Sequence, residues 1–88
     1  MVLQAFEEYF TRVTDGRYVN FYGFIGDAIR EADVVFAQKN NGATVLQRPD
    51  LHESFSGMVQ DSLRNMGAPV DLEKEVGTRL KEFFRLNM

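Results

Sequence analysis

The amino-acid sequence predicts an all-α protein, a small bundle of about four helices that ends in an antiparallel helical hairpin. Apolar residues recur at spacings of three and four through most of the chain, which is the pattern of amphipathic helices. Short groups of Gly, Asn, Asp and Pro interrupt this pattern at intervals typical of turns. Only residues 43–47 have strand propensity, and no second strand is present to pair with them. With 88 residues, the chain is expected to form a single helical domain over residues 1–88.

The first helix is expected from about Val2 to Val13. Its apolar residues share one face: Leu3, Phe6, Phe10 and Val13. The Thr-Asp-Gly sequence at residues 14–16 is a strong turn signal and ends the helix.

Residues 17–39 form the second helical region, with an apolar stripe from Tyr18 to Phe36. Gly23 and Gly26 interrupt this stripe, and each costs about 1 kcal/mol relative to Ala inside a helix. We therefore expect an irregular first part and a regular helix from about Gly26 to Gln38. The Asn-Asn-Gly sequence at residues 40–42 ends it, and residues 43–49 form a connector that Val45 and Leu46 are expected to pack.

The C-terminal part reads as two helices joined by a tight turn. Asp50 and Glu53 have the spacing of a capping box at the start of the first helix. Gly67 and Pro69 stop that helix, and Asp71 is expected to cap the next one. The buried side of the first helix comprises Leu51, Phe55, Met58, Val59, Leu63 and Met66, and that of the second comprises Leu72, Val76, Leu80, Phe83 and Phe84.

Composition excludes several classes of protein. The net charge is −3 and the ten Lys and Arg residues are spread along the chain, so no basic stripe for nucleic acid is present. With no Cys, the chain has no disulfide, thiolate nucleophile or cysteine-ligated metal. No apolar run approaches the roughly 18 residues of a membrane-spanning helix, and the apolar start is too short for a signal sequence. We expect a cytoplasmic protein that binds neither membranes nor nucleic acid.

No residue pattern indicates catalysis, and we expect neither an enzyme nor a bound cofactor or metal. His52 is the only histidine, whereas metal sites need several convergent ligands. Its position in the first turn of a helix favours an exposed surface residue over a metal ligand, haem ligand or general base. Asp27 and Arg30 are expected to form an ion pair on a solvated helix face.

The densest apolar stretch indicates a partner-binding surface formed by Tyr18, Phe21, Tyr22 and Phe24. Successive helical residues are about 100° apart, so Phe21, Tyr22 and Phe24 fan around the axis and do not share one buried stripe. Exposed aromatic residues are typical of interfaces with a protein partner or a second copy of the chain. The alternative is that all of these rings belong to the core of so small a domain.

Two parts of the chain together resemble the truncated hemoglobins. Residues 10–13 (Phe-Thr-Arg-Val) followed by Phe21 and Tyr22 are similar to a helix and aromatic pair of that family, and residues 55–76 are similar to its last two helices and their turn. The resemblance implies a globin-like helical fold. However, the family's proximal histidine would fall near Gly42, where no histidine occurs, and the segment after Tyr22 is too short for the full haem-facing helix. The resemblance therefore implies a shortened, haem-free chain.

From these observations we expect a small non-catalytic protein-binding module, such as an accessory subunit, adaptor or inhibitor, that acts through its aromatic helical surface. The alternative is a minimal globin-like protein that binds haem or another flat apolar ligand. In that case His52 is the single candidate for a ligand residue.

Overall fold

The computed structural model describes residues 2–86, and all regular structure among them is helical. Four α-helices follow one another: α1 (Val2–Val13), α2 (Tyr22–Lys39), α3 (His52–Asn65) and α4 (Val70–Leu86). Three short 3₁₀ turns lie between them: η1 (Val19–Phe21), η2 (Val45–Gln47) and η3 (Pro49–Leu51). The predicted all-α fold class is therefore confirmed.

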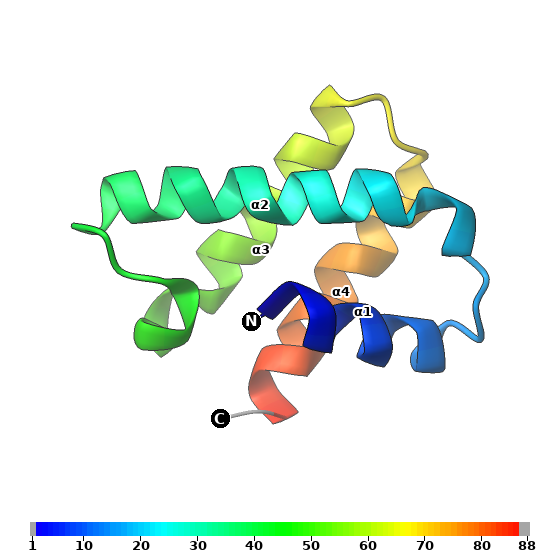
Figure 1. Cartoon of the computed structure of the whole chain (residues 1–88), viewed down its shortest axis with the longest axis horizontal. Coiled ribbons are helices and arrows are strands. Elements are labelled where there is room, and N and C mark those ends of the chain that lie inside the picture. Colours follow the sequence, from blue (N-terminus) through cyan, green and yellow to red (C-terminus); the bar gives the residue numbers. More distant parts are fainter. Residues whose placement is uncertain (1, 87–88) are drawn as a thin grey trace.

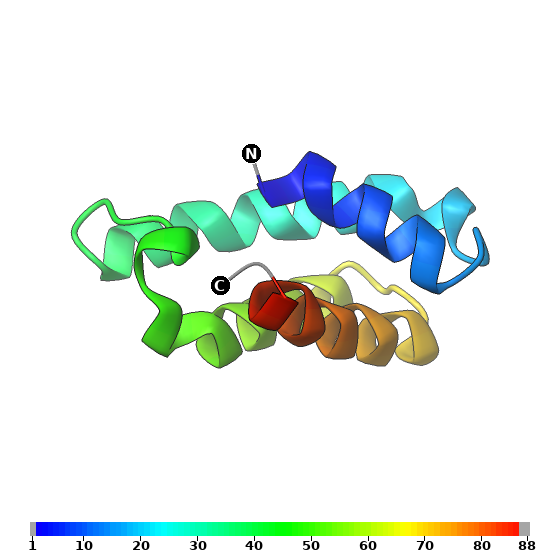
Figure 2. The same cartoon turned by 90° about the horizontal axis from the view of Figure 1, so that it is seen from below.

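The helices form two layers (Figures 1 and 2). Figure 2 shows α1 and α2 in one layer and α3 and α4 in the other. Helices α3 and α4 form the predicted antiparallel hairpin, and α2 runs across it in Figure 1. The arrangement is therefore two crossed pairs of helices.

Aromatic rings join the two layers at the centre of the core. Phe55 of α3 lies with its ring centroid 5.9 Å from those of both Phe36 on α2 and Phe84 on α4. The apolar stripes predicted for the hairpin face this core, and Leu63 and Leu80 are both completely buried. The remaining fully buried large side chains are Phe6, Phe10, Ile25, Ile29, Val45, Val59 and Leu72.

The turn between α3 and α4 forms as predicted. Gly67 adopts a positive φ of 81°, which favours glycine because a Cβ would be strained there. The amide of Ala68 donates to the carbonyl of Leu63 at 3.0 Å, and that of Gly67 donates to the carbonyl of Arg64 at 3.1 Å. These two bonds are the Schellman motif, which satisfies the last carbonyls of α3.

Helix α2 begins at Tyr22, four residues before the predicted start at Gly26. Gly23 lies in open space on the exposed side of this helix, while Gly26 lies beneath the guanidinium group of Arg30. The helix continues through both glycines, so their intrinsic cost does not break it here. The predicted irregular part is confined to the turn at residues 14–18 and to η1.

The predicted capping box at the start of α3 is wrong. The carboxylate of Asp50 accepts hydrogen bonds from the Arg48 guanidinium group at 3.1 and 3.3 Å, and it caps no helix. This bond is the main cause that lowers the pKa of Asp50. The η3 turn also delays the first α-helical residue to His52. A capping box forms instead at η2, where the Gln47 side chain accepts the Thr44 amide at 2.9 Å.

Two smaller predictions about the connections also fail. Val45 is buried as expected, but Leu46 is 51% exposed and does not pack the connector. Asp71 is the second residue of α4, which begins at Val70, so it does not occupy the capping position.

Candidate protein-binding surface

The structure adds Val19, an exposed residue of the preceding turn, to the aromatic residues predicted to bind a partner. Phe24 is 39% exposed and Val19 is 57% exposed, while Phe21 and Tyr22 are half-buried. The Phe21 and Phe24 rings lie 6.2 Å apart, so they form one continuous feature. We call Val19, Phe21, Tyr22 and Phe24 the aromatic surface; it lies at η1 and the first turn of α2.

Tyr18 does not belong to the aromatic surface, contrary to the prediction, because its side chain is only 9% exposed. Its ring packs 5.8 Å from that of Phe10 on α1, and its hydroxyl group donates to Asp71 on α4 at 3.5 Å. The guanidinium carbon of Arg17 lies 5.1 Å from the ring centroid. Tyr18 therefore turns inward between α1 and α4, away from any partner.

Tyr22 is fixed by α1, since its hydroxyl group is hydrogen-bonded to that of Thr11. The ring consequently lies at the boundary between α1 and α2. Phe24 points away from the buried stripe of α2, as its position around the helix predicts, and it is the most exposed aromatic residue of this surface.

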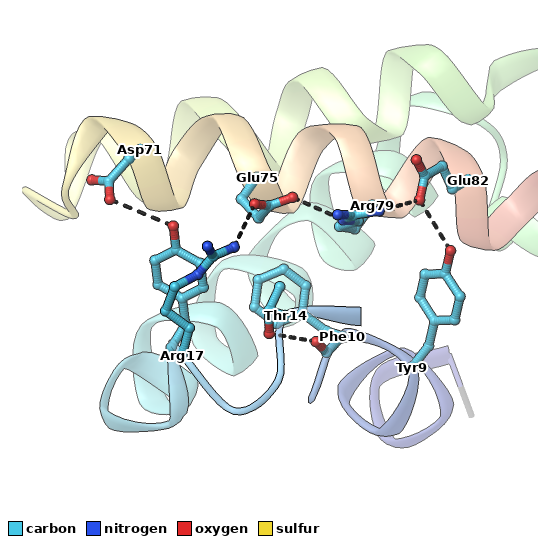
Figure 3. Close-up of polar contacts among 9 residues, drawn as sticks. Tyr9, Phe10, Thr14, Arg17, Asp71, Glu75, Arg79 and Glu82 are labelled. Atoms are coloured by element: carbon cyan, nitrogen blue, oxygen red, sulfur yellow. Dashed lines mark hydrogen bonds and ion pairs between the residues drawn. The ribbon is translucent and has the colours of Figure 1, made fainter. Parts of the chain in front are cut away.

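A polar network joins α1 and the following turn to α4 (Figure 3). Glu75 accepts from Arg17 at 3.1 Å and from Arg79 at 2.8 Å. Glu82 accepts from Arg79 at 2.9 Å and from the Tyr9 hydroxyl group at 3.0 Å. We call these five residues, with Tyr18 and Asp71, the α1–α4 polar network; it orients the turn that leads to the aromatic surface.

Glu82 and Tyr9, two members of the α1–α4 polar network, have pKa values shifted in opposite directions. The hydrogen bond from Arg79 is the main cause that lowers the pKa of Glu82, because it favours the charged carboxylate. Burial is the main cause that raises the pKa of Tyr9, and the bond to Glu82 adds to it. Both groups therefore keep the protonation states that their hydrogen bond requires at neutral pH.

A second set of polar residues lies between α3 and α4, where the sequence analysis expected only apolar contacts. His52, Ser56, Gln60 and Arg64 recur every four residues along α3. Arg64 forms an ion pair with Glu73, which is 7% exposed, and the Gln60 amide donates to the Glu73 carbonyl at 3.3 Å. We call these four residues of α3 the polar row.

His52 is not the exposed residue that the sequence analysis expected. Its ring stacks on Phe84 with centroids 4.3 Å apart, and it is half-buried. The His52 Nε2 atom is buried without a hydrogen-bond partner, and so is the Ser56 Oγ atom one turn later. The stacking holds the imidazole ring against α4, which explains why a position in the first helical turn does not expose it.

The surface has shallow hollows at two helix boundaries. One of about 340 Å³ lies between α1 and the end of α4 and is lined by Ala5, Glu8, Tyr9, Arg12, Phe83 and Leu86. Another of about 220 Å³ lies between α2 and α3, with Glu31, Lys39, Met58 and Asp61 among its lining residues. His52 lines neither hollow. Across residues 2–86, no three His, Asp or Glu side chains are placed to hold a metal ion together.

Comparison with known proteins gives no relative: no family model, curated protein or solved structure matches the chain. The likeness to truncated hemoglobins therefore remains a resemblance in sequence. None of the helices in the described part of the chain has the length and apolarity needed to cross a membrane.

Proposed function

We propose that this chain is a non-catalytic protein-binding module that acts through the aromatic surface. The observation that carries the proposal is the exposure of Phe24 and of Val19, with the Phe21 ring 6.2 Å from that of Phe24. Aromatic residues are enriched at the energetic centres of interfaces, where a rigid ring fills a pocket of the partner. An accessory subunit, adaptor or inhibitor of the cytoplasm fits this role.

The surroundings of Phe24 support the same proposal. Gly23 adds no side chain beside the ring, so a partner can approach the backbone of α2 closely. Arg17 and the pair Asp27 and Arg30 provide charged groups near the aromatic surface. An apolar centre with a polar rim is the usual composition of a specific interface.

The proposal is tested by comparing partner capture by immobilised wild-type protein, Phe24→Asp and Leu46→Asp. Leu46 is the matched control, since it is a similarly exposed apolar residue on η2. We expect Phe24→Asp to lose the captured protein and Leu46→Asp to retain it, with the helical circular dichroism signal unchanged in both. Equal capture by all three proteins would show that the interface lies elsewhere.

The second candidate function, binding of haem or another flat apolar ligand, is favoured by one observation. His52 Nε2 is buried and has no hydrogen-bond partner within the protein, which makes it a candidate ligand atom. The test is titration of the purified protein with haemin. A Soret band that appears with wild-type protein and disappears with His52→Gln would establish this function, and identical spectra of the two proteins would exclude His52 as a ligand.

A further inference from the structure

The face of α2 that is turned away from α3 and α4 is open over its whole length (Figure 1). Gly23, Asp27, Arg30 and Val34 form its central line at spacings of four, three and four, and all are exposed. Asp27 and Arg30 form an ion pair at 2.9 Å with side chains 66% and 59% exposed, and Val34 is 59% exposed. Phe24 flanks this line. The face therefore carries Asp27 and Arg30 near its centre and the apolar Val34 towards one end, with Phe24 and the exposed Glu31 along one side.

We propose that the partner of this face is a second copy of the chain, with the two α2 helices antiparallel about a two-fold axis. This inference rests on the proposed function, since it identifies the protein that Phe24 contacts. In the proposed dimer, the two-fold axis passes beside the midpoint between Ala28 and Ile29. Residue pairs whose numbers sum to 57 then face each other across the interface.

The charges of α2 are complementary to themselves in this register. Asp27 of each copy faces Arg30 of the other, so the two-fold axis relates two identical intermolecular pairs. Together with the pair within each helix, the four charges alternate in sign around the axis. Such a network contributes more than an isolated exposed pair, and a parallel arrangement would instead bring each charge close to its own copy.

The apolar residues of α2 are complementary in the same register. Gly23 of each copy faces Val34 of the other, and no atom outside the helix lies within 4 Å of a Cβ position at Gly23, so the valine side chain has room. Phe24 lies next to this contact and covers it from the side. Val34 of each copy thus packs on the backbone at Gly23 beside Phe24 of the other copy, which removes apolar surface from water.

The size of the contact limits its strength. A helix of 18 residues is about 27 Å long, and one helix face buries less than the roughly 800 Å² per partner of a standard interface. We therefore expect a weak, reversible dimer, and the test uses protein concentrations of about 0.1–1 mM. Sedimentation equilibrium over that range measures its dissociation constant.

Charge exchange tests the inference. The Asp27→Arg variant carries two bases on the face, and the Arg30→Asp variant carries two acids, so each repels its own copy. We expect each variant alone to dimerise at least about tenfold more weakly than wild-type protein. In a 1:1 mixture, the bases of one variant face the acids of the other, and we expect the dimer to return. Val34→Asp should weaken the wild-type dimer without disturbing the core, since Val34 is exposed.

Asp61→Arg is the matched control. Asp61 and Arg64 form a pair of the same spacing on α3 at 3.1 Å, outside the proposed face. This variant should dimerise like wild-type protein. Wild-type protein that stays monomeric at about 1 mM would overturn the inference, and so would variants that do not recover on mixing.

The same measurements separate this inference from the proposed function. A monomeric wild-type protein that still captures a different protein in a Phe24-dependent way would refute self-pairing and leave the protein-binding function intact. If neither the capture of a different protein nor self-association depends on Phe24, both the inference and the proposed function are refuted.

Discussion

Gly77 on α4 shows how closely single residues of the hairpin approach each other. A Cβ atom at this position would overlap the side chain of Gln60, and the overlap reaches the Cγ atom of that residue at 2.9 Å. Gly57 on α3 is also helical, but no atom lies within 4 Å of its Cβ position. Alanine therefore has room for its Cβ atom at position 57 but not at position 77.

We expect Gly77→Ala to lower the free energy of unfolding, although alanine in a helix is normally favoured over glycine by about 1 kcal/mol. The cause is the displacement of Gln60 and the loss of its bond to the Glu73 carbonyl. Urea denaturation followed by circular dichroism measures the change. Gly57→Ala should be stabilising, and Gly77→Ala combined with Gln60→Ala should recover stability. Equal stabilisation by both single glycine variants would contradict this account.

Asp33 on α2 is a residue whose charge opposes folding. It is half-buried, and burial raises its pKa above the ordinary value of 3.8. A raised pKa means that its contribution to stability is complete below the unfolded-state value and is lost as the pH rises through the folded-state value. We therefore expect Asp33→Asn to be more stable than wild-type protein at pH 7, with the difference vanishing near about pH 3. Thermal unfolding across this range measures it; a constant difference would show that the charge is not the cause.

Among the elements, α1 is held to α4 by both apolar and polar contacts. Phe6 and Phe10 are fully buried, while the α1–α4 polar network lies along one face of α4. Glu82 is the part of this network whose charge stabilises the fold, since its pKa is lowered mainly by Arg79.

Glu82→Gln should have a pH dependence opposite in sign to that of Asp33→Asn. Because the pKa of Glu82 is lowered in the fold, its contribution is present above the ordinary value of 4.5 and is lost as the pH falls through the folded-state value. We expect the variant to be less stable than wild-type protein at pH 7 and to approach it under acidic conditions. Thermal midpoints from about pH 7 to pH 3 measure the difference, and a gap that widens on acidification would contradict this role.

The sequence predicts elements better than it predicts their polar contacts. The apolar stripe of the hairpin, from Phe55 to Phe84, and the stop at Gly67 are local patterns. Both helices of the hairpin and the turn between them could therefore be inferred from the sequence. The start of α3 was missed because Arg48 competes for the Asp50 carboxylate, a contact that the capping pattern does not include.

The aromatic surface was only partly predictable for a related reason. The angle of Phe24 around the helix follows from its position in the sequence, and its exposure was inferred correctly. The burial of Tyr18 depends on Asp71, which lies 53 residues away, and on Phe10 of another helix. No pattern within a single helix contains such long-range contacts.

In the whole molecule, the two layers carry different spectroscopic groups. All three tyrosines, Tyr9, Tyr18 and Tyr22, belong to α1, α2 or the segment between them, and the chain has no tryptophan. Tyrosine fluorescence therefore reports on the α1 and α2 layer and on its contact with α4, through the Tyr9–Glu82 and Tyr18–Asp71 hydrogen bonds. The shared aromatic contacts of Phe36, Phe55 and Phe84 indicate that both layers unfold together.

Leu80→Ala tests this coupling, because Leu80 lies in the layer without tyrosine and is completely buried. We expect a loss of about 2–5 kcal/mol in the free energy of unfolding, from lost burial and the cavity left behind. The urea midpoints from tyrosine fluorescence and from circular dichroism should fall by the same amount. Val70→Ala is the exposed control and should change little. Separate midpoints for the two signals would show that the layers unfold independently.

The polar row of α3 also favours one register of α3 along α4. An apolar stripe alone permits α3 and α4 to shift by one helical turn, since one buried leucine or valine can replace another. In the observed position, Arg64 meets Glu73 and Gln60 lies over Gly77, the one place on that side of α4 without a side chain. A shift of one turn would separate Arg64 from Glu73 and press Gln60 against a larger residue. The row therefore selects one alignment among several that the apolar contacts would accept.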